Sequence, residues 1–193
     1  MNKLQSSLIF RQIIVFVAWF ALAIQLYILI DRTPENGLTP LSAIGRFLLF
    51  FTILSNLLVA TSLTIVSLWP LSGAARFFSR IPVISAITVY IFMVGLVYNI
   101  ILRYTWDPRG LQLLADEMLH VAVPLLYVIY WLLFIPKGQL KWVHVLSWLI
   151  FPLFYVVYAL IRGALEGFYP YPFLDVNTLG YTRVFLNAIL LFA

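Results

Sequence analysis

The chain has 193 residues, of which 64% are hydrophobic and 10% are charged, and it carries a net charge of +5 and no cysteine. Soluble domains contain roughly 45–50% apolar and about 25% charged residues, so this composition excludes a soluble globular protein. The lack of cysteine excludes disulfides, zinc–thiolate sites, iron–sulfur clusters and a cysteine nucleophile. Any catalytic chemistry must therefore use oxygen, amine or imidazole groups.

A membrane-spanning helix needs about 20 mainly apolar residues. Six such runs are joined by short connections rich in Pro and Gly, and they cover residues 12–30, 44–69, 83–104, 113–135, 142–163 and 178–193. The sequence therefore predicts an all-α polytopic membrane protein, a six-helix bundle that forms a single domain over residues 1–193. The first run is too long for a signal peptide, so we expect a retained helix. Because no basic residues flank the last run, we expect the natural chain to continue beyond Ala193.

The charges give an orientation if the six runs cross the membrane alternately. The N-terminus and the loops after the second and fourth runs then share one side, which holds basic residues and no acid. Basic residues favour the cytoplasmic side, so we expect a cytoplasmic N-terminus, although six arginines belong to the opposite half. All seven acids lie on or toward the extracytoplasmic or luminal side: Asp31, Glu35, Asp107, Asp116, Glu117, Glu166 and Asp175.

Polar side chains inside the membrane are costly and usually face the bundle interior, so each is a candidate functional residue. On the second run, Thr52, Ser55 and Asn56 have the spacing of one helix face. Counted from Ile44 along a continuous helix, Thr52 lies roughly 12 Å deep at 1.5 Å per residue.

Three further runs carry polar stripes toward the same side of the membrane. Asn99 and Arg103 lie one turn apart on the third run, and Asp116 and His120 lie one turn apart on the fourth. We expect these stripes to line one polar cavity that opens to the acidic side. The fifth run adds Tyr155, Tyr158 and Arg162.

Two prolines predict bends in the helices that carry these stripes. Pro124 has no N–H to donate to the carbonyl of His120, four residues earlier, so we expect a kink there. Pro152 predicts a second kink, one turn below Tyr155. Both kinks would make room for a pocket.

Structural roles are open for the same residues. A threonine in a membrane helix usually bonds back to its own helix, an asparagine usually joins two helices, and a buried histidine is often only structural. Metal binding by Asp116, Glu117 and His120 is disfavoured because only one imidazole is available, so we expect no metal site. Scattered cations and the absence of a glycine-rich phosphate loop exclude a nucleic-acid or nucleotide site of the usual kind.

Three sequence blocks resemble the androgen-induced-gene and androgen-dependent TFPI-regulating protein family, which are six-helix membrane threonine hydrolases. The blocks are Gly45-Arg46-Phe47 followed by Phe51-Thr52-Ile53-Leu54-Ser55-Asn56-Leu57, then Met118-Leu119-His120-Val121-Ala122-Val123-Pro124, and Tyr171-Pro172-Phe173-Leu174-Asp175. Members of this family cleave fatty acid esters of hydroxy fatty acids. The eukaryotic members have more His and Trp around the fourth and fifth runs, where this chain has Tyr155, Tyr158 and Arg162. The chain therefore resembles a bacterial type of this family, and other lipid esters are further candidate substrates.

The resemblance implies that Thr52 is the nucleophile and His120 the base of a lipid ester hydrolase embedded in the bilayer, with no cofactor. Ester hydrolysis also needs groups that support the base or stabilise the oxyanion, for which the candidates are Ser55, Asn56, Asn99, Asp116 and Tyr155. Arg103, Tyr158 and Arg162 are candidates for substrate binding. The alternative is a membrane transporter or lipid-binding protein whose one-sided polar cavity only binds.

Overall fold

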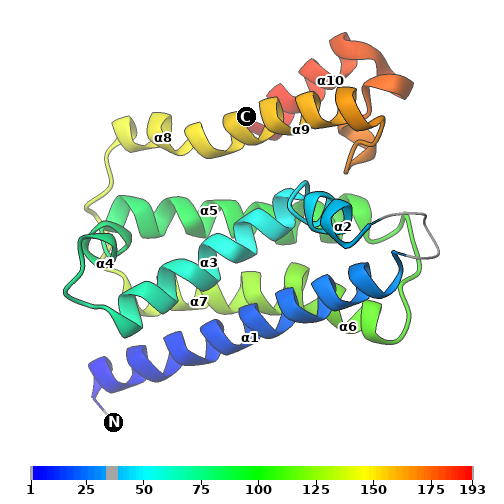
Figure 1. The fold of residues 1–193 in the computed structure, drawn as a ribbon. Helices are drawn as coiled ribbons and strands as arrows, with labels where there is room; N and C mark the ends of the chain where they lie inside the picture. Colours follow the sequence, from blue (N-terminus) through cyan, green and yellow to red (C-terminus); the bar gives the residue numbers. More distant parts are fainter. Residues whose placement is uncertain (1, 34–38, 193) are drawn as a thin grey trace. The chain divides into compact units, whose positions relative to one another are not determined.

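The computed structural model describes residues 2–33 and 39–192, and within these residues it contains helices and no strand (Figure 1). The all-α prediction is therefore confirmed. Every apolar run identified in the sequence corresponds to helix, although several runs are divided into shorter elements.

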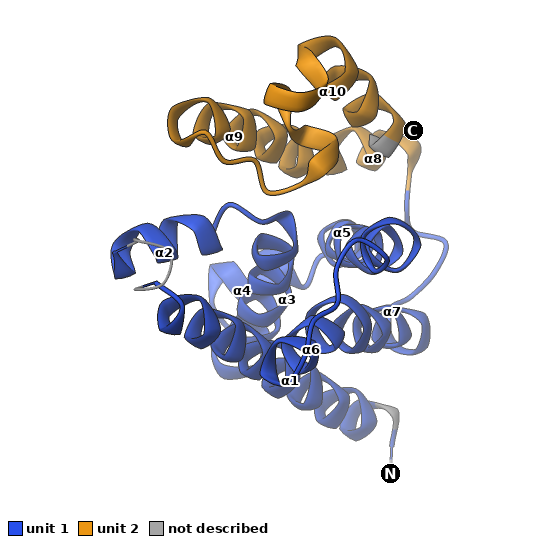
Figure 2. Ribbon diagram, turned by 90° about the vertical axis from the view of Figure 1, so that its right-hand side faces the viewer, with its two compact units in different colours: residues 1–140 blue, residues 141–193 orange. Residues whose placement is uncertain are grey.

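The chain forms two compact units, residues 1–140 and residues 141–193 (Figure 2). The first unit contains α1 (Lys3–Asp31), α2 (Pro40–Phe47), α3 (Phe51–Leu68), α4 (Gly73–Phe78), α5 (Ile81–Val97), α6 (Leu111–Glu117) and α7 (Val123–Phe134). Two π-helical segments, η1 (Tyr98–Leu102) and η2 (Met118–Ala122), extend α5 and join α6 to α7. The second unit contains α8 (Trp142–Trp148), α9 (Ile150–Glu166), a 3-10 turn η3 (Pro172–Leu174) and α10 (Val176–Phe192). A single domain over the whole chain stays a prediction.

Five helical segments in the described part of the chain are long and apolar enough to cross a membrane: Leu4–Asp31, Phe51–Leu68, Ile81–Leu102, Leu111–Phe134 and Trp142–Glu166. The sixth run corresponds to α10, which has 17 residues and a non-helical backbone at Gly180, where φ is 72°.

The second run is not one helix, as the sequence suggested, but α2 followed by α3. Residues 48–50 form the break, and Phe50 has an extended backbone. No Pro or Gly marks this break, and the buried side chains of Phe47 and Leu49 indicate that packing fixes it. Thr52 therefore lies in the first turn of α3 rather than two turns inside a longer helix.

The fifth run is also divided, between α8 and α9 at Leu149. Pro152 lies in the first turn of α9, where a missing N–H leaves no intrahelical bond unmade. The interruption at Leu149 lies within the helical segment Trp142–Glu166, and the kink expected at Pro152 stays a prediction.

The core of the first unit lies among α1, α3, α5 and α7, which run alongside one another in Figure 1. α1 packs on α3, α6 and α7, and α5 packs on α3 and α7. Several polar side chains are buried in this unit, and three of them, Thr52, Ser55 and Asn56, lie in the first two turns of α3, which packs on η2. This arrangement brings the first turn of α3 against the segment that contains His120.

Candidate active site

Thr52 and His120 are in contact. The Thr52 hydroxyl oxygen lies 3.2 Å from His120 Nε2, a hydrogen-bonding distance between residues 68 positions apart in the chain. Thr52 is 7% exposed, so little solvent competes for this hydroxyl. The pair that the sequence singled out is therefore adjacent in the fold, whereas its catalytic role stays a prediction.

The surroundings of the imidazole indicate which nitrogen carries the proton. His120 Nδ1 lies 2.9 Å from the backbone carbonyl oxygen of Asp116, one turn earlier. A carbonyl only accepts hydrogen bonds, so we assign the proton of the neutral ring to Nδ1. Nε2 then presents its lone pair to the Thr52 hydroxyl, which is the arrangement that a general base requires.

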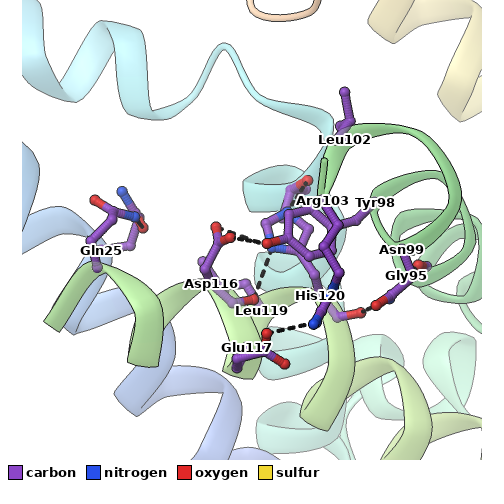
Figure 3. Close-up of polar contacts among 12 residues, drawn as sticks. Gln25, Gly95, Tyr98, Asn99, Leu102, Arg103, Asp116, Glu117, Leu119 and His120 are labelled. Atoms are coloured by element: carbon purple, nitrogen blue, oxygen red, sulfur yellow. Dashed lines mark hydrogen bonds and ion pairs between the residues drawn. The ribbon is translucent and has the colours of Figure 1, made fainter. Parts of the chain in front are cut away.

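Asp116 and Tyr98 hold the other side of the imidazole (Figure 3). Asp116 Oδ1 lies 3.5 Å from His120 Nδ1, and the Tyr98 hydroxyl donates a hydrogen bond to Asp116 Oδ2. The Tyr98 ring also stacks on the imidazole, with 4.0 Å between centroids and an interplanar angle of 16°. The carboxylate and the ring therefore restrict the position and rotation of His120.

Both π-helical segments belong to this site. π-helical residues make up well under 1% of protein structure and are frequent at functional sites. Here η1 carries Tyr98 and Asn99, and η2 carries His120. The backbone N–H of Arg103 bonds to the Tyr98 carbonyl, five residues earlier, at 2.8 Å. This wider turn places the Arg103 guanidinium 5.4 Å from the Tyr98 ring centroid.

Arg103 lies beside the site and is paired with an acid. Its guanidinium donates to Glu117 at 2.6 Å, and both side chains are more than one third exposed. This hydrogen bond raises the pKa of Arg103 above its ordinary value, so the guanidinium stays charged. A role in binding substrate stays a prediction, and the pairing means that an anionic ligand would have to displace or share Glu117.

Asn56 and Asn99 each use one amide nitrogen to bridge two carbonyls. Asn56 Nδ2 donates to the carbonyls of Thr52 at 2.8 Å and Leu119 at 3.2 Å. Asn99 Nδ2 donates to the carbonyls of Gly95 at 2.7 Å and His120 at 3.4 Å. An amide NH₂ has two hydrogens, so these bonds occupy both. Of the two roles that the sequence suggested, the contacts favour support over oxyanion stabilisation.

Ser55 is fully buried in the same turn of α3, and its hydroxyl has no hydrogen-bond partner in the described structure. The amide oxygen of Asn56 is likewise buried without a donor. Unpaired buried polar atoms cost free energy, and they are tolerated more often at sites that bind something else. A supporting role for Ser55 stays a prediction.

Tyr155, Tyr158 and Arg162 belong to the second unit, where all three lie on α9. Arg162 Nε donates to Glu166 at 2.8 Å, and another guanidinium nitrogen lies 3.3 Å from the Tyr158 hydroxyl. Tyr155 is buried. Its supporting role, the substrate-binding role of the other two and a shared polar cavity with Thr52 all stay predictions.

No group of three His, Asp or Glu side chains in residues 2–33 and 39–192 is placed to hold a metal ion. Asp116 and His120 do lie together, but Glu117 is turned to Arg103. The expected absence of a metal site stays a prediction.

Tyr98 is a residue of this site that the polar pattern of the sequence did not indicate. Tyr98 and Arg103 are five residues apart. An α-helix places residues at this spacing on different faces, whereas a π turn places them on the same face. The signal that the sequence does contain is the adjacency of Tyr98 to Asn99, since both belong to a run with few other polar groups.

Comparisons of the chain with models of protein families, with curated proteins and with solved structures give no match.

Proposed function

We propose that the chain is an intramembrane hydrolase of lipid esters, with Thr52 as nucleophile and His120 as general base. The observation that carries the proposal is the 3.2 Å contact between the Thr52 hydroxyl and His120 Nε2. The Nδ1 contact with the Asp116 carbonyl supports it, because that contact directs the basic nitrogen to the hydroxyl. The motif resemblance suggests fatty acid esters of hydroxy fatty acids as substrates and a relation to the membrane threonine hydrolases.

In the first half of the reaction, Thr52 Oγ attacks the ester carbonyl carbon while its proton passes to His120 Nε2. The tetrahedral intermediate then breaks the bond to the leaving alcohol oxygen, which takes the proton from Nε2. The fatty acyl group remains on Thr52 as an ester. Because Thr52 lies in the first turn of α3, the positive end of the helix dipole favours the negative charge on the carbonyl oxygen.

In the second half, a water molecule gives a proton to His120 Nε2 and attacks the acyl carbon. Collapse of this second intermediate breaks the bond to Thr52 Oγ, which recovers its proton from the imidazole. The products are a fatty acid and an alcohol, and no redox or metal-dependent step is required by this sequence of events. Asp116 and Tyr98 keep the ring in place while it carries positive charge.

The function is tested by incubating the purified protein, in detergent or lipid nanodiscs, with a fatty acid ester of a hydroxy fatty acid. We expect equal amounts of free fatty acid and hydroxy fatty acid to accumulate with repeated turnover, as measured by mass spectrometry. Binding of the ester without any product would instead support the alternative of a lipid-binding protein and contradict the proposed hydrolase.

We further propose that the N-terminus is cytoplasmic and that the site faces the extracytoplasmic side. The loop at Asp107 and the loop at Gln139 lie at opposite ends of the span Leu111–Phe134. Since the chain has no cysteine, Asp107→Cys and Gln139→Cys each introduce a single thiol at an exposed position. We expect a membrane-impermeant maleimide to label Asp107→Cys in intact cells and Gln139→Cys only after permeabilisation. The reverse pattern would contradict this orientation.

A further inference from the structure

Pro124 leaves a gap in the backbone hydrogen bonding of the helix that carries His120. The N–H of residue 124 would bond to the Leu119 carbonyl in a π pattern or to the His120 carbonyl in an α pattern. In the structure the N–H of Val123 bonds to Met118, five residues earlier. Proline has no N–H, so residue 124 donates a hydrogen bond to neither of these two carbonyls. Buried carbonyls without a donor are costly, so a partner from elsewhere is expected.

Two asparagines from neighbouring helices supply these partners. Asn56 of α3 donates to the Leu119 carbonyl, and Asn99 of η1 donates to the His120 carbonyl. Each amide also donates to the carbonyl four residues earlier in its own helix, which is Thr52 for one and Gly95 for the other. Each asparagine thus connects its own helix to the segment that carries the base.

Close backbone packing makes the second connection possible. A Cβ atom on Gly95 would lie 3.1 Å from the His120 carbonyl oxygen and 3.1 Å from Pro124 Cβ. The lack of a side chain at Gly95 therefore lets α5 approach the base segment closely enough for Asn99 to reach it. Gly95, Asn99 and Pro124 form one structural unit around the His120 carbonyl.

We propose that Asn56 and Asn99 are positioning residues that replace the N–H missing at Pro124 and thereby hold His120 at the nucleophile. Asn56 joins the carbonyl of Thr52 directly to the segment of the base, so it fixes the separation of the two reacting groups. Asn99 fixes the same segment from the opposite helix. The catalytic part of this inference rests on the proposed hydrolase function, whereas the replacement of the missing N–H does not.

The test is a double-variant cycle between Asn99 and Pro124. Asn99→Ala removes the side-chain donor and should lower the midpoint of thermal unfolding by several degrees. Pro124→Ala restores a backbone N–H that can reach the His120 carbonyl. Asn99→Ala lowers the unfolding midpoint, and in the double variant we expect at least about half of this decrease to be recovered. The reason is that the new backbone N–H replaces the amide donor. Independent effects that simply add would overturn the proposal.

A control cycle uses Asn187→Ala, because the amide of Asn187 donates to the Phe173 carbonyl at 3.0 Å in the second unit. The change in the unfolding midpoint caused by Asn187→Ala should add to the change caused by Pro124→Ala. If Asn99→Ala alone does not fold, recovery of folded protein in the double variant supports the proposal, and its failure to fold overturns it.

A spectroscopic measurement separates positioning from stability and requires no substrate. The chain has two histidines, so His144→Gln leaves His120 as a single imidazole for ¹⁵N NMR. We expect a neutral ring protonated at Nδ1 in the parent protein and a mixture of tautomers in Asn56→Ala and Asn99→Ala. The same tautomer in folded samples of all three would overturn the positioning role. Because this readout is independent of hydrolysis, it can fail or succeed separately from the proposed function.

Discussion

We expect Thr52→Ala and His120→Ala each to lower kcat for lipid ester hydrolysis by about 10³-fold or more. Loss of the nucleophile removes the acyl-enzyme route, and loss of the base leaves the Thr52 hydroxyl without a proton acceptor. The two groups act as one unit, so the double variant should be no slower than the slower single variant. Steady-state kinetics on purified protein, with thermal unfolding to verify folding, measures these effects.

Thr61→Ala provides a matched control on the same helix. The Thr61 hydroxyl donates to the Leu57 carbonyl at 2.6 Å and so bonds only within α3. We expect this variant to keep kcat within about 2-fold of the parent, since surface or local hydrogen bonds contribute little to the reaction. Activity of folded Thr52→Ala equal to that of Thr61→Ala would exclude Thr52 as nucleophile.

Of the substitutions described, we expect Gly95→Val to cause the largest decrease in the free energy of unfolding. Even the Cβ atom would lie 3.1 Å from a backbone oxygen and 3.1 Å from Pro124 Cβ, and neither is the end of a flexible side chain. Overpacking of this kind costs about 1–3 kcal/mol, and the two methyl groups of valine favour the upper part of that range. Since the displaced segment carries His120, we also expect at least about a 10-fold loss of kcat.

Gly73→Val serves as the control for this change. Gly73 begins α4 and has no atom within 4 Å of its added Cβ, so the same substitution there meets open space. Chemical or thermal unfolding of both variants in one detergent measures the difference. Equal unfolding midpoints for Gly95→Val and Gly73→Val would show that the close approach of α5 to the base segment is not needed.

The fold class followed from the sequence because long apolar runs leave the backbone no alternative to helix in lipid. The break between α2 and α3 did not follow, since residues 48–50 contain neither Pro nor Gly and their conformation is set by the burial of Phe47 and Leu49. Local patterns contain no information on such packing. A continuous helix from Ile44 would place Thr52 two turns inside it, whereas Thr52 lies in the first turn of α3.

The contact between Thr52 and His120 was expected from two short motifs, whereas the groups that orient the imidazole were expected only in part. Asp116 has α-helical spacing to His120 and was identified. Tyr98 was missed because its relation to the site passes through a π turn, and α-helical spacing places it on another face. The kink expected at Pro124 stays a prediction, and the hydrogen bonds that Asn56 and Asn99 donate to the Leu119 and His120 carbonyls were not expected from the sequence.

The most direct measurement of the central claim is the identity of the residue that carries the acyl group during turnover. The protein is mixed with a lipid ester, quenched in acid within the first turnover and digested, and the acylated peptide is sequenced by mass spectrometry. We expect a fatty acyl ester on Thr52 in the parent protein and none in Thr52→Ala or His120→Ala. An acyl group on another residue, or product formation with no acylated Thr52 at any time, would contradict it.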